Sequence, residues 1–268
     1  MRSVIKSALA VAALTSGLSG CVYNEELGRS QFMLTGNRAM ASAATASWNQ
    51  IKQQQPISRD PRYTARLNRV AQRILRAAGE DPNRWEYLVF EDDSLNAFAL
   101  PGERIGIHTG IMDIMENDAQ LATVVGHEIA HVKYQHSGER YSQQLAASLG
   151  IGIASIAASA SCDSPSARDR QNCQQRNSAA VQAIGLGAMF GAILPYSRKH
   201  ELEADVGGVR YMAQAGYDVC ESLKFWTKMA QASSGQGRPP EFASTHPAAG
   251  TRISQLRNTT RQLGKNCR

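Results

Sequence analysis

The residues best suited to catalysis are His127, Glu128 and His131, in the segment His-Glu-Ile-Ala-His. Positions four apart on an α-helix point in nearly the same direction, so the two imidazoles can bind one metal ion. Glu128 lies about 100° round the same helix, where it can reach a water molecule near the metal without being a ligand. This pattern is typical of zinc peptidase sites, in which the metal lowers the pKa of water and the carboxylate takes up its proton.

A third ligand must come from elsewhere, because a catalytic zinc has three protein ligands and one open position. The histidine-ligand version of this site needs a histidine six residues after His131, where the sequence has Ser137, so that class of site is excluded. The segment Glu201-Leu-Glu-Ala-Asp205 is the alternative. Glu201 and Asp205 share one helical face, so we expect Glu201 to bind zinc and Asp205 to accept the outer N–H of a histidine ligand.

Two nearby polar residues are interpreted as lying outside this site. Glu203 is turned about 200° from Glu201 round their helix, and we interpret it as a surface charge. His136 lies nine residues after His127. On a continuous helix that spacing points it about 180° away, and we interpret His136 as structural.

The first motif lies in a segment that predicts a mostly apolar helix. Asn117 and Gln120 form a capping pair at its start, and we expect the helix to run to about His136. Burying two histidines and a glutamate on such a helix is costly without a metal ion. The second motif falls on another predicted helix, over about 198–215.

The other elements predict an α+β fold, mostly helical with a small sheet. In chain order we expect a tether and helix within 21–59 (the helix over 24–54), then an undivided domain over 60–264. That domain begins with a helix from Asp60-Pro61 to Gly79, a strand over 85–89 and a hairpin of 96–100 and 104–108 around Pro101-Gly102, and it ends with helices near 218–233 and 250–263.

Two segments rich in Ala, Gly, Ser and Ile, 143–161 and 178–195, predict a helical hairpin inserted into this domain at about 143–195. Serines and glycines interrupt both segments. We therefore favour a buried or lid-forming hairpin over a pair of helices that dips into a membrane.

The first twenty residues are typical of an exported bacterial lipoprotein. Arg2 and Lys6 precede an apolar stretch, and the sequence Leu-Ser-Gly ends at Cys21. This resembles the signal whose cysteine becomes the acylated first residue, so we expect residues 1–20 to be removed. The alternative is an ordinary secretory signal with an incidental cysteine. Val22, rather than an aspartate, favours sorting to the outer membrane.

Export would place the other four cysteines in an oxidising compartment. Three pairings are possible. We favour Cys162 with Cys173, which closes a polar loop, and Cys220 with Cys267, which ties the C-terminus to a helix. Free buried thiols are the alternative.

The charge balance favours no nucleic-acid partner. The formal net charge is +6, and two of the positive charges belong to the predicted signal. No basic cluster interleaved with aromatic residues occurs in the sequence, so we expect an ordinary solvated surface.

Four separated segments resemble the CAAX-prenyl-protease/HtpX-like family of zinc metallopeptidases. They are His127–His131, Tyr196–Asp205, Asn96–Gly102, and Thr245-His-Pro247 through Arg252-Ile253. The resemblance spans roughly residues 60–260, and with the predicted signal it is strongest to the lipoprotein members. One departure is Glu103, where a second glycine is common.

The resemblance implies a gluzincin fold with one zinc ion per chain, held by His127, His131 and Glu201. A substrate strand is expected to pair with the edge of a small sheet over the metal, and the 96–108 hairpin is the candidate edge. The resemblance also implies that His246 lies near the metal, as an oxyanion stabiliser or as a group that blocks the open position. From the residues alone, a histidine before a proline is equally compatible with a structural turn.

We therefore expect a zinc metalloendopeptidase that is lipid-anchored to the outer membrane, faces the periplasm and hydrolyses unfolded or misassembled envelope proteins. Glu128 is the expected general base. The alternative is a periplasmic chaperone or assembly factor that uses the same cleft with a plugged zinc site. Either protein would have envelope polypeptides, the membrane and outer-membrane assembly machinery as its partners.

Overall fold

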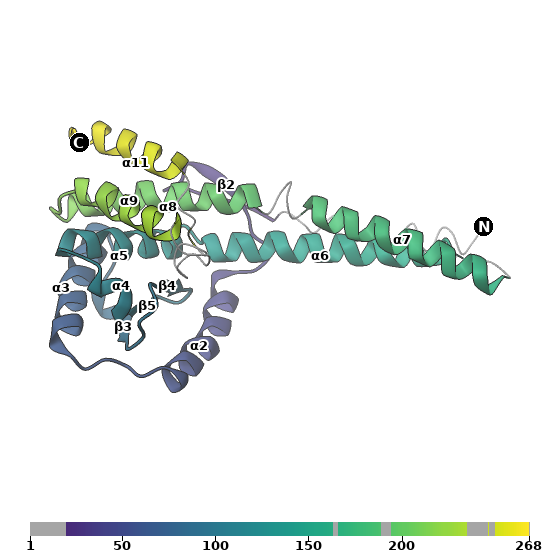
Figure 1. Ribbon diagram of the computed structural model, residues 1–268, viewed down its shortest axis with the longest axis horizontal. Helices are drawn as coiled ribbons and strands as arrows, with labels where there is room; N and C mark the ends of the chain where they lie inside the picture. Colours follow the sequence, from purple (N-terminus) through teal and green to yellow (C-terminus); the bar gives the residue numbers. More distant parts are fainter. Residues whose placement is uncertain (1–19, 163–165, 189–193, 235–245, 247–249, 268) are drawn as a thin grey trace. The chain divides into compact units, whose positions relative to one another are not determined.

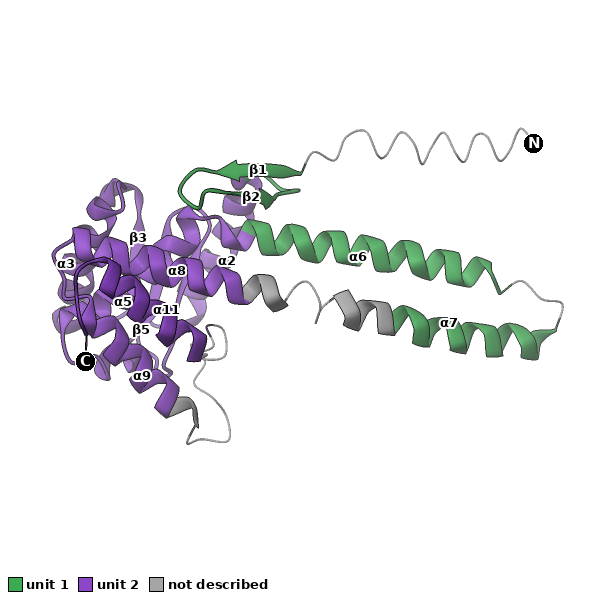
Figure 2. Cartoon of the chain, turned by 90° about the horizontal axis from the view of Figure 1, so that it is seen from above, with its two compact units in different colours: residues 1–36, 138–188 green, residues 37–137, 189–268 purple. Residues whose placement is uncertain are grey.

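The computed structural model describes residues 20–162, 166–188, 194–234, 246 and 250–267. Within these ranges the side chains of 183–188, 194–197 and 232–234 are not described. Helices dominate and two small sheets accompany them, so the predicted α+β class is confirmed (Figure 1). The chain divides into two compact units, residues 1–36 with 138–188 and residues 37–137 with 189–268 (Figure 2).

The larger unit holds the elements that build the site. In chain order they are α2 (Asn37–Gln54), α3 (Pro61–Ala77), the 3₁₀ helix η1 (Pro82–Arg84), β3 (Glu86–Phe90), β4 (Ala97–Leu100), β5 (Arg104–His108), α4 (Thr109–Asp113), α5 (Asp118–Lys133), α8 (Leu194–Gln214), α9 (Cys220–Ser234) and α11 (Gly250–Gln262). The helices predicted near 198–215, 218–233 and 250–263 correspond to α8, α9 and α11.

Helix α3 forms where its caps and its apolar stripe predict it. The Asp60 carboxylate accepts a hydrogen bond from the Arg62 backbone N–H at 2.8 Å, and Pro61 occupies the first turn. Leu67, Val70, Ile74 and Leu75 form a fully buried stripe. The helix ends before Gly79, whose φ of +74° is easily adopted only by glycine.

The second sheet contains the predicted hairpin. β4 and β5 are antiparallel neighbours, β3 pairs with β5 in parallel, and the strand order is β3-β5-β4. The connecting turn has φ of +87° at Gly102 and +67° at Glu103. A second glycine would suit the turn because both positions are left-handed. In the order β3-β5-β4, β4 is an edge among the described strands, as the family resemblance implies.

Helix α5 begins as predicted but ends earlier. The Asn117 side chain accepts the Gln120 backbone N–H at 3.0 Å, and the Gln120 side chain accepts the Glu116 N–H at 3.0 Å. The helix stops at Lys133, and Gln135 breaks it with a left-handed φ of +56°. The expectation of one continuous helix to His136 is therefore wrong.

Helices α5 and α8 touch backbone to backbone at two glycines. A Cβ atom on Gly208 would lie 2.8 Å from the His127 backbone N, and one on Gly126 would lie 3.0 Å from the Gly208 carbonyl oxygen. Any side chain at these positions would separate the helices. The two glycines thereby bring His127 on α5 close to the face of α8 that carries Glu201 and Asp205.

The smaller unit begins with a β-hairpin that was not predicted from the sequence. β1 (Cys21–Asn24) and β2 (Arg29–Phe32) pair antiparallel, so the helix predicted over 24–54 begins only at Asn37. The Arg29 guanidinium donates two hydrogen bonds to the buried Glu139 carboxylate, at 2.9 and 2.8 Å. Gln31 donates a third at 2.9 Å. These contacts hold β2 against the helix that contains Glu139.

Two long helices complete the smaller unit, α6 (His136–Ala160, within the unit from Gly138) and α7 (Ala167–Ala188). α6 is long and apolar enough to cross a membrane, with none of the qualifying window buried. A single helix of this kind does not establish a span. Leu149, Ile153 and Ile156 are exposed, so a buried hairpin is the wrong description of α6, and the lid and membrane alternatives stay predictions.

Candidate metal centre

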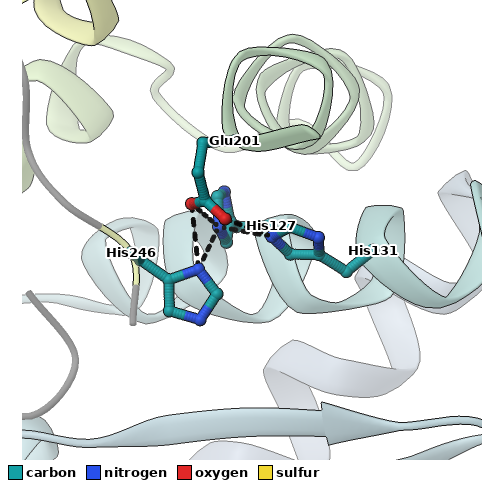
Figure 3. A group of neighbouring side chains, drawn as sticks. All are labelled: His127, His131, Glu201 and His246. Atoms are coloured by element: carbon teal, nitrogen blue, oxygen red, sulfur yellow. Dashed lines mark hydrogen bonds and ion pairs between the residues drawn. The ribbon is translucent and has the colours of Figure 1, made fainter. Parts of the chain in front are cut away.

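Three predicted ligands converge where α5 crosses α8 (Figure 3). His127 Nε2 lies 3.0 Å from His131 Nε2 and 3.2 Å from Glu201 Oε2. His131 Nε2 lies 3.3 Å from Glu201 Oε1. His127 and Glu201 are buried, and His131 is mostly so. The helical spacing of the two histidines therefore works as the sequence predicts.

This donor set fits a zinc ion in chemistry and in spacing. Two imidazole nitrogens and a carboxylate are a common ligand set of catalytic zinc. Tetrahedral bonds of about 2.0–2.1 Å would place ligand atoms about 3.3 Å apart. The side chains of His127, His131 and Glu201 already have their nitrogen and oxygen atoms 3.0–3.3 Å apart.

His246 joins this group from outside both helices. Its Nδ1 lies 2.9 Å from Glu201 Oε2 and 3.1 Å from His127 Nε2, and Figure 3 shows the ring beside the ligand atoms. Its Nε2 lies 3.5 Å from Glu128 Oε1. Four potential ligand atoms, one each from His127, His131, Glu201 and His246, lie within 4.8 Å of one another. The structure therefore places His246 in the site rather than in a remote turn.

Asp205 contacts the outer nitrogen of His127, as its position on α8 predicts. The distance from His127 Nδ1 to Asp205 Oδ1 is 3.0 Å. Burial alone would lower the pKa of His127, but the Asp205 and Glu201 carboxylates overcome it and raise that pKa to about 9. A carboxylate in this position fixes the N–H on Nδ1 and leaves Nε2 to face the ligand group.

Arg252 on α11 holds Asp205, a role that was not predicted from the sequence. Its Nε and Nη2 donate to the two Asp205 carboxylate oxygens at 2.7 and 2.6 Å. Nη1 donates to the His246 backbone carbonyl at 2.9 Å, and the guanidinium lies 3.8 Å from the Trp226 ring centre. Burial would raise the pKa of Asp205, but the Arg252 charge holds it below its usual value.

The sequence points to Arg252 through a matched motif but does not show what its side chain does. Arg252-Ile253 belongs to a matched motif, yet nothing in the local sequence tells a buried arginine from a solvated one. Its partners come from α8 and from His246. Only the tertiary structure shows that one guanidinium joins Asp205 to the His246 backbone.

Glu128 is buried between the ligand group and the edge strand. Burial raises the pKa of its carboxyl group, and the nearby His246 and His127 oppose this. The Ala99 backbone amide on β4 donates a hydrogen bond to it. Among the described residues, Glu128 Oε1 has no hydrogen-bond partner. A buried carboxyl group that has a raised pKa, and whose Oε1 faces His246 Nε2 at 3.5 Å without a hydrogen bond, is suited to accept a proton.

His136 and Glu203 require a correction. His136 is buried, and its Nδ1 lies 2.9 Å from His131 Nδ1 because the turn at Gln135 brings it back toward α5. Its Nε2 lies 3.1 Å from Glu203 Oε2. Burial lowers the pKa of His136 to about 4, and the Glu203 contact opposes that effect. Glu203 is therefore a contact of a buried histidine rather than a surface charge.

The remaining predicted residues are the five cysteines and parts of the signal and of the fourth motif. Cys162 pairs with Cys173, and Cys220 with Cys267, as the sequence predicts. Cys21 is an exposed free thiol at the start of β1. The predicted signal, apart from Gly20, lies outside the described residues, as do Thr245 and Pro247 of the fourth motif.

Comparison with known proteins assigns the family. The sequence matches Peptidase family M48 over residues 61–260, which include every residue of the ligand group. The chain belongs to this family. The predicted resemblance to HtpX-like zinc metallopeptidases is thus confirmed.

Curated relatives of the M48 chain come from a yeast and from a bacterium. It is 33% identical over 193 residues to the mitochondrial metalloendopeptidase OMA1 of Schizosaccharomyces pombe, covering 72% of this chain and 52% of that one. It is 27% identical over 219 residues to the beta-barrel assembly-enhancing protease of Escherichia coli K12, covering 80% and 42%. This chain thus spans about half, or less, of the length of these relatives.

Proposed function

We propose that this M48 chain is a zinc-dependent endopeptidase with His127, His131 and Glu201 as its zinc ligands. The main support is that the ligand atoms of these three side chains lie 3.0–3.3 Å apart, beside the buried Glu128. A structural metal site has no use for a buried carboxyl group that lies next to its ligands and is not a ligand itself. A hydrolytic site needs one as its base.

Each residue has a separate task in this proposal. Bound zinc would polarise the scissile carbonyl and lower the pKa of water. Glu128 accepts the proton of the attacking water and returns it to the leaving amine. Its buried environment, which raises its pKa, helps it to hold that proton between the two steps. Asp205 orients His127 and is itself held by Arg252.

The edge strand β4 supports polypeptides as the substrate class. An extended segment can add to a free sheet edge through main-chain hydrogen bonds, with little dependence on sequence. β4 is such an edge among the described strands, and its Ala99 amide reaches Glu128. Together with the similarity to the beta-barrel assembly-enhancing protease of E. coli, this leads us to propose unfolded or misassembled envelope proteins as substrates, with outer-membrane assembly machinery as a partner.

His246 supports a second, closed state of the same site. Its ring lies among the ligand atoms, where a substrate carbonyl would also have to approach. In the proposed closed state His246 competes with the substrate, and the cleft can hold a client without cutting it. In the open state, His246 Nε2 would be free to stabilise the oxyanion.

The peptidase proposal is tested by release of peptides from casein. The wild-type chain loaded with zinc is expected to release them, and a chelator is expected to stop release. Glu128→Gln is expected to lower the rate about 10²–10⁴-fold while zinc still binds. Glu116→Gln is the matched control, because Glu116 is an exposed partner of Lys228. Full activity of Glu128→Gln would contradict the proposal.

His246→Ala separates the two states. A rate increase would show that His246 blocks the site, and a decrease of about 10²–10³-fold would show that it stabilises the oxyanion. If the wild type and His246→Ala both fail to cut casein yet suppress aggregation of an unfolded client, the chaperone alternative replaces the peptidase.

We also propose that Cys21 is acylated and that the chain is anchored to the outer membrane, facing the periplasm. Supporting this are the signal-like sequence before Cys21, its exposed thiol, and two disulfides that need an oxidising compartment. Cells grown with labelled palmitate are expected to label the wild-type chain, and Cys21→Ser is expected to abolish the label. Equal membrane association of both chains, without label, would contradict the anchor.

A further inference from the structure

A second group of polar side chains lies directly behind the proposed zinc ligands. It consists of His136, His200 and Glu203, whose metal-binding atoms lie within 4.8 Å of one another. His136 and His200 are buried, and the Glu203 side chain is only 16% exposed. Burying three such groups is costly unless each of them has a partner. The group reaches the proposed zinc ligands through the contact of His136 with His131.

The contacts form a single chain of hydrogen bonds. Glu203 Oε2 lies 3.1 Å from His136 Nε2, and His136 Nδ1 lies 2.9 Å from His131 Nδ1. The other nitrogen of His131, Nε2, faces His127 and Glu201. One continuous path therefore runs from the Glu203 carboxylate to the metal-facing lone pair of His131.

Donor and acceptor chemistry fixes the protons along this path. An ionised carboxylate can only accept, so His136 must donate to it from Nε2. A neutral imidazole carries one N–H, so His136 Nδ1 presents a lone pair. His131 must then donate from its own Nδ1, so that a metal ion held with His127 and Glu201 can take the lone pair of its Nε2. That is the protonation state that a metal ligand requires.

We propose that Glu203 and His136 are positioning residues that hold His131 in the Nδ1–H tautomer needed to bind metal. The proposal rests on the proposed function. It gives each ligand histidine a carboxylate behind it, Asp205 directly for His127 and Glu203 through His136 for His131. His200 stacks on His136, with ring centres 4.3 Å apart and planes 14° apart, and so fixes the plane of the intermediate ring.

A second metal ion in this group is the competing explanation, and the geometry disfavours it. The lone pairs of an imidazole lie in the plane of its ring, so two nearly parallel stacked rings do not direct them at one point. Both nitrogens of His136 are also engaged by His131 and Glu203. The group therefore fits an orienting role better than a ligand role.

Two substitutions at His136 test whether its Nδ1 atom is needed as a hydrogen-bond acceptor, or whether any polar side chain of similar size is enough. In His136→Asn the amide oxygen takes the place of Nδ1 and can still accept from His131. In His136→Gln the amide lies where Nε2 was, so the contact with Glu203 is kept and the acceptor is lost. Glu203→Gln keeps the shape of the side chain but can donate as well as accept, which removes the constraint on the tautomer.

Zinc affinity, measured by competition with a chelator, is the first readout. His136→Gln and Glu203→Gln are expected to weaken zinc binding about 10–100-fold, whereas His136→Asn is expected to stay within about threefold of the wild type. Glu221→Gln is the control, because this buried carboxylate accepts hydrogen bonds from Asn117 and Gln120 and does not touch the ligand group. Unchanged affinity in Glu203→Gln, or binding of two zinc ions per wild-type chain, would overturn the proposal.

The second readout needs neither metal nor activity. Nitrogen-15 NMR of histidine-labelled, metal-free protein reports which ring nitrogen carries the proton. His131 Nδ1 is expected to carry a proton in the wild type and to carry it in only part of the molecules in Glu203→Gln. An unprotonated His131 Nδ1 in the wild type would refute the chain of hydrogen bonds. If His131 Nδ1 is protonated as expected but the zinc-loaded wild type does not cut casein, the proposed function fails while this inference stands.

Discussion

At the scale of residues, the two buried glutamates of the site are driven in opposite directions. Burial raises the pKa of Glu128. Burial would do the same for Glu201, but His131 and His246 hold the pKa of Glu201 well below its usual value. A carboxyl that stays ionised suits a metal ligand, and one that takes up a proton readily suits a base. The environments therefore support the two proposed roles independently of the motif.

Glu221, which lies outside the site, allows a test of how a shifted carboxyl pKa makes the stability of the fold depend on pH. Burial alone would raise the pKa of Glu221, but hydrogen bonds from Lys224, Asn117 and Gln120 lower it. Because the folded pKa is depressed, Glu221 contributes stability above its unfolded pKa of about 4.3, and this contribution is lost as the pH falls through the folded value.

We therefore expect Glu221→Gln to cost about 1–2 kcal/mol of unfolding free energy at neutral pH and much less at a pH of about 3. Urea denaturation of both chains at the two pH values measures the difference. A cost that does not depend on pH would show that shape, not charge, matters at this position.

At the scale of elements, the sequence predicted the helix starts and the hairpin turn that depend on nearby residues. Asp60-Pro61 starts α3, Asn117 with Gln120 starts α5, and Pro101-Gly102 turns the β4–β5 hairpin. Each of these depends on side chains within a few residues of the backbone that they organise. The ligand positions followed for the same reason, since the i, i+4 spacing carries the geometry.

Features that depend on distant partners were missed or misread. β1 and β2 are short strands stabilised by Glu139, far along the chain, so the local composition suggested helix instead. Gln135 carries no turn signal of its own, yet its left-handed conformation directs His136 to His131. The role of Arg252 needed the folded position of Asp205. In each case the missing information was tertiary.

The glycine contact between α5 and α8 gives the prediction at this scale. In Gly208→Ala the new Cβ would meet backbone atoms of His127 and Gly126 at 2.8 and 3.0 Å, which cannot move aside cheaply. We expect a loss of about 1–3 kcal/mol in unfolding free energy and weaker zinc binding, because α8 carries Glu201. Thermal unfolding and chelator competition measure both effects.

Gly150→Ala in α6 is the matched control, since nothing lies within 4 Å of a Cβ at that position. It is expected to be neutral or slightly stabilising. A Gly208→Ala chain as stable as Gly150→Ala would show that the two helices do not require a glycine contact.

At the scale of the whole molecule, each unit has its own covalent link. Cys220–Cys267 spans 47 residues within the larger unit, and Cys162–Cys173 spans 11 within the smaller one. A cross-link stabilises mainly by restricting the unfolded chain, and the effect grows with the loop that it closes. The disulfide of the unit that holds the site is therefore expected to matter more for stability.

We expect Cys220→Ser with Cys267→Ser to lower the unfolding free energy of the larger unit by about 2–4 kcal/mol. Cys162→Ser with Cys173→Ser is expected to leave the unfolding of that unit and the zinc affinity unchanged. Calorimetry of both double variants with and without zinc checks this. Equal losses from the two pairs would contradict the assignment of each disulfide to its own unit.

The free edge of β4 has a consequence for which proteins would be cut. Since main-chain pairing offers little sequence discrimination, a client is selected by how often it exposes an extended segment. That frequency is set by the client's own free energy of local unfolding, and each 1.4 kcal/mol changes it tenfold. Under the proposed function, a stably folded client survives and a marginal one is degraded, so the cleavage rate would measure the client's folding stability.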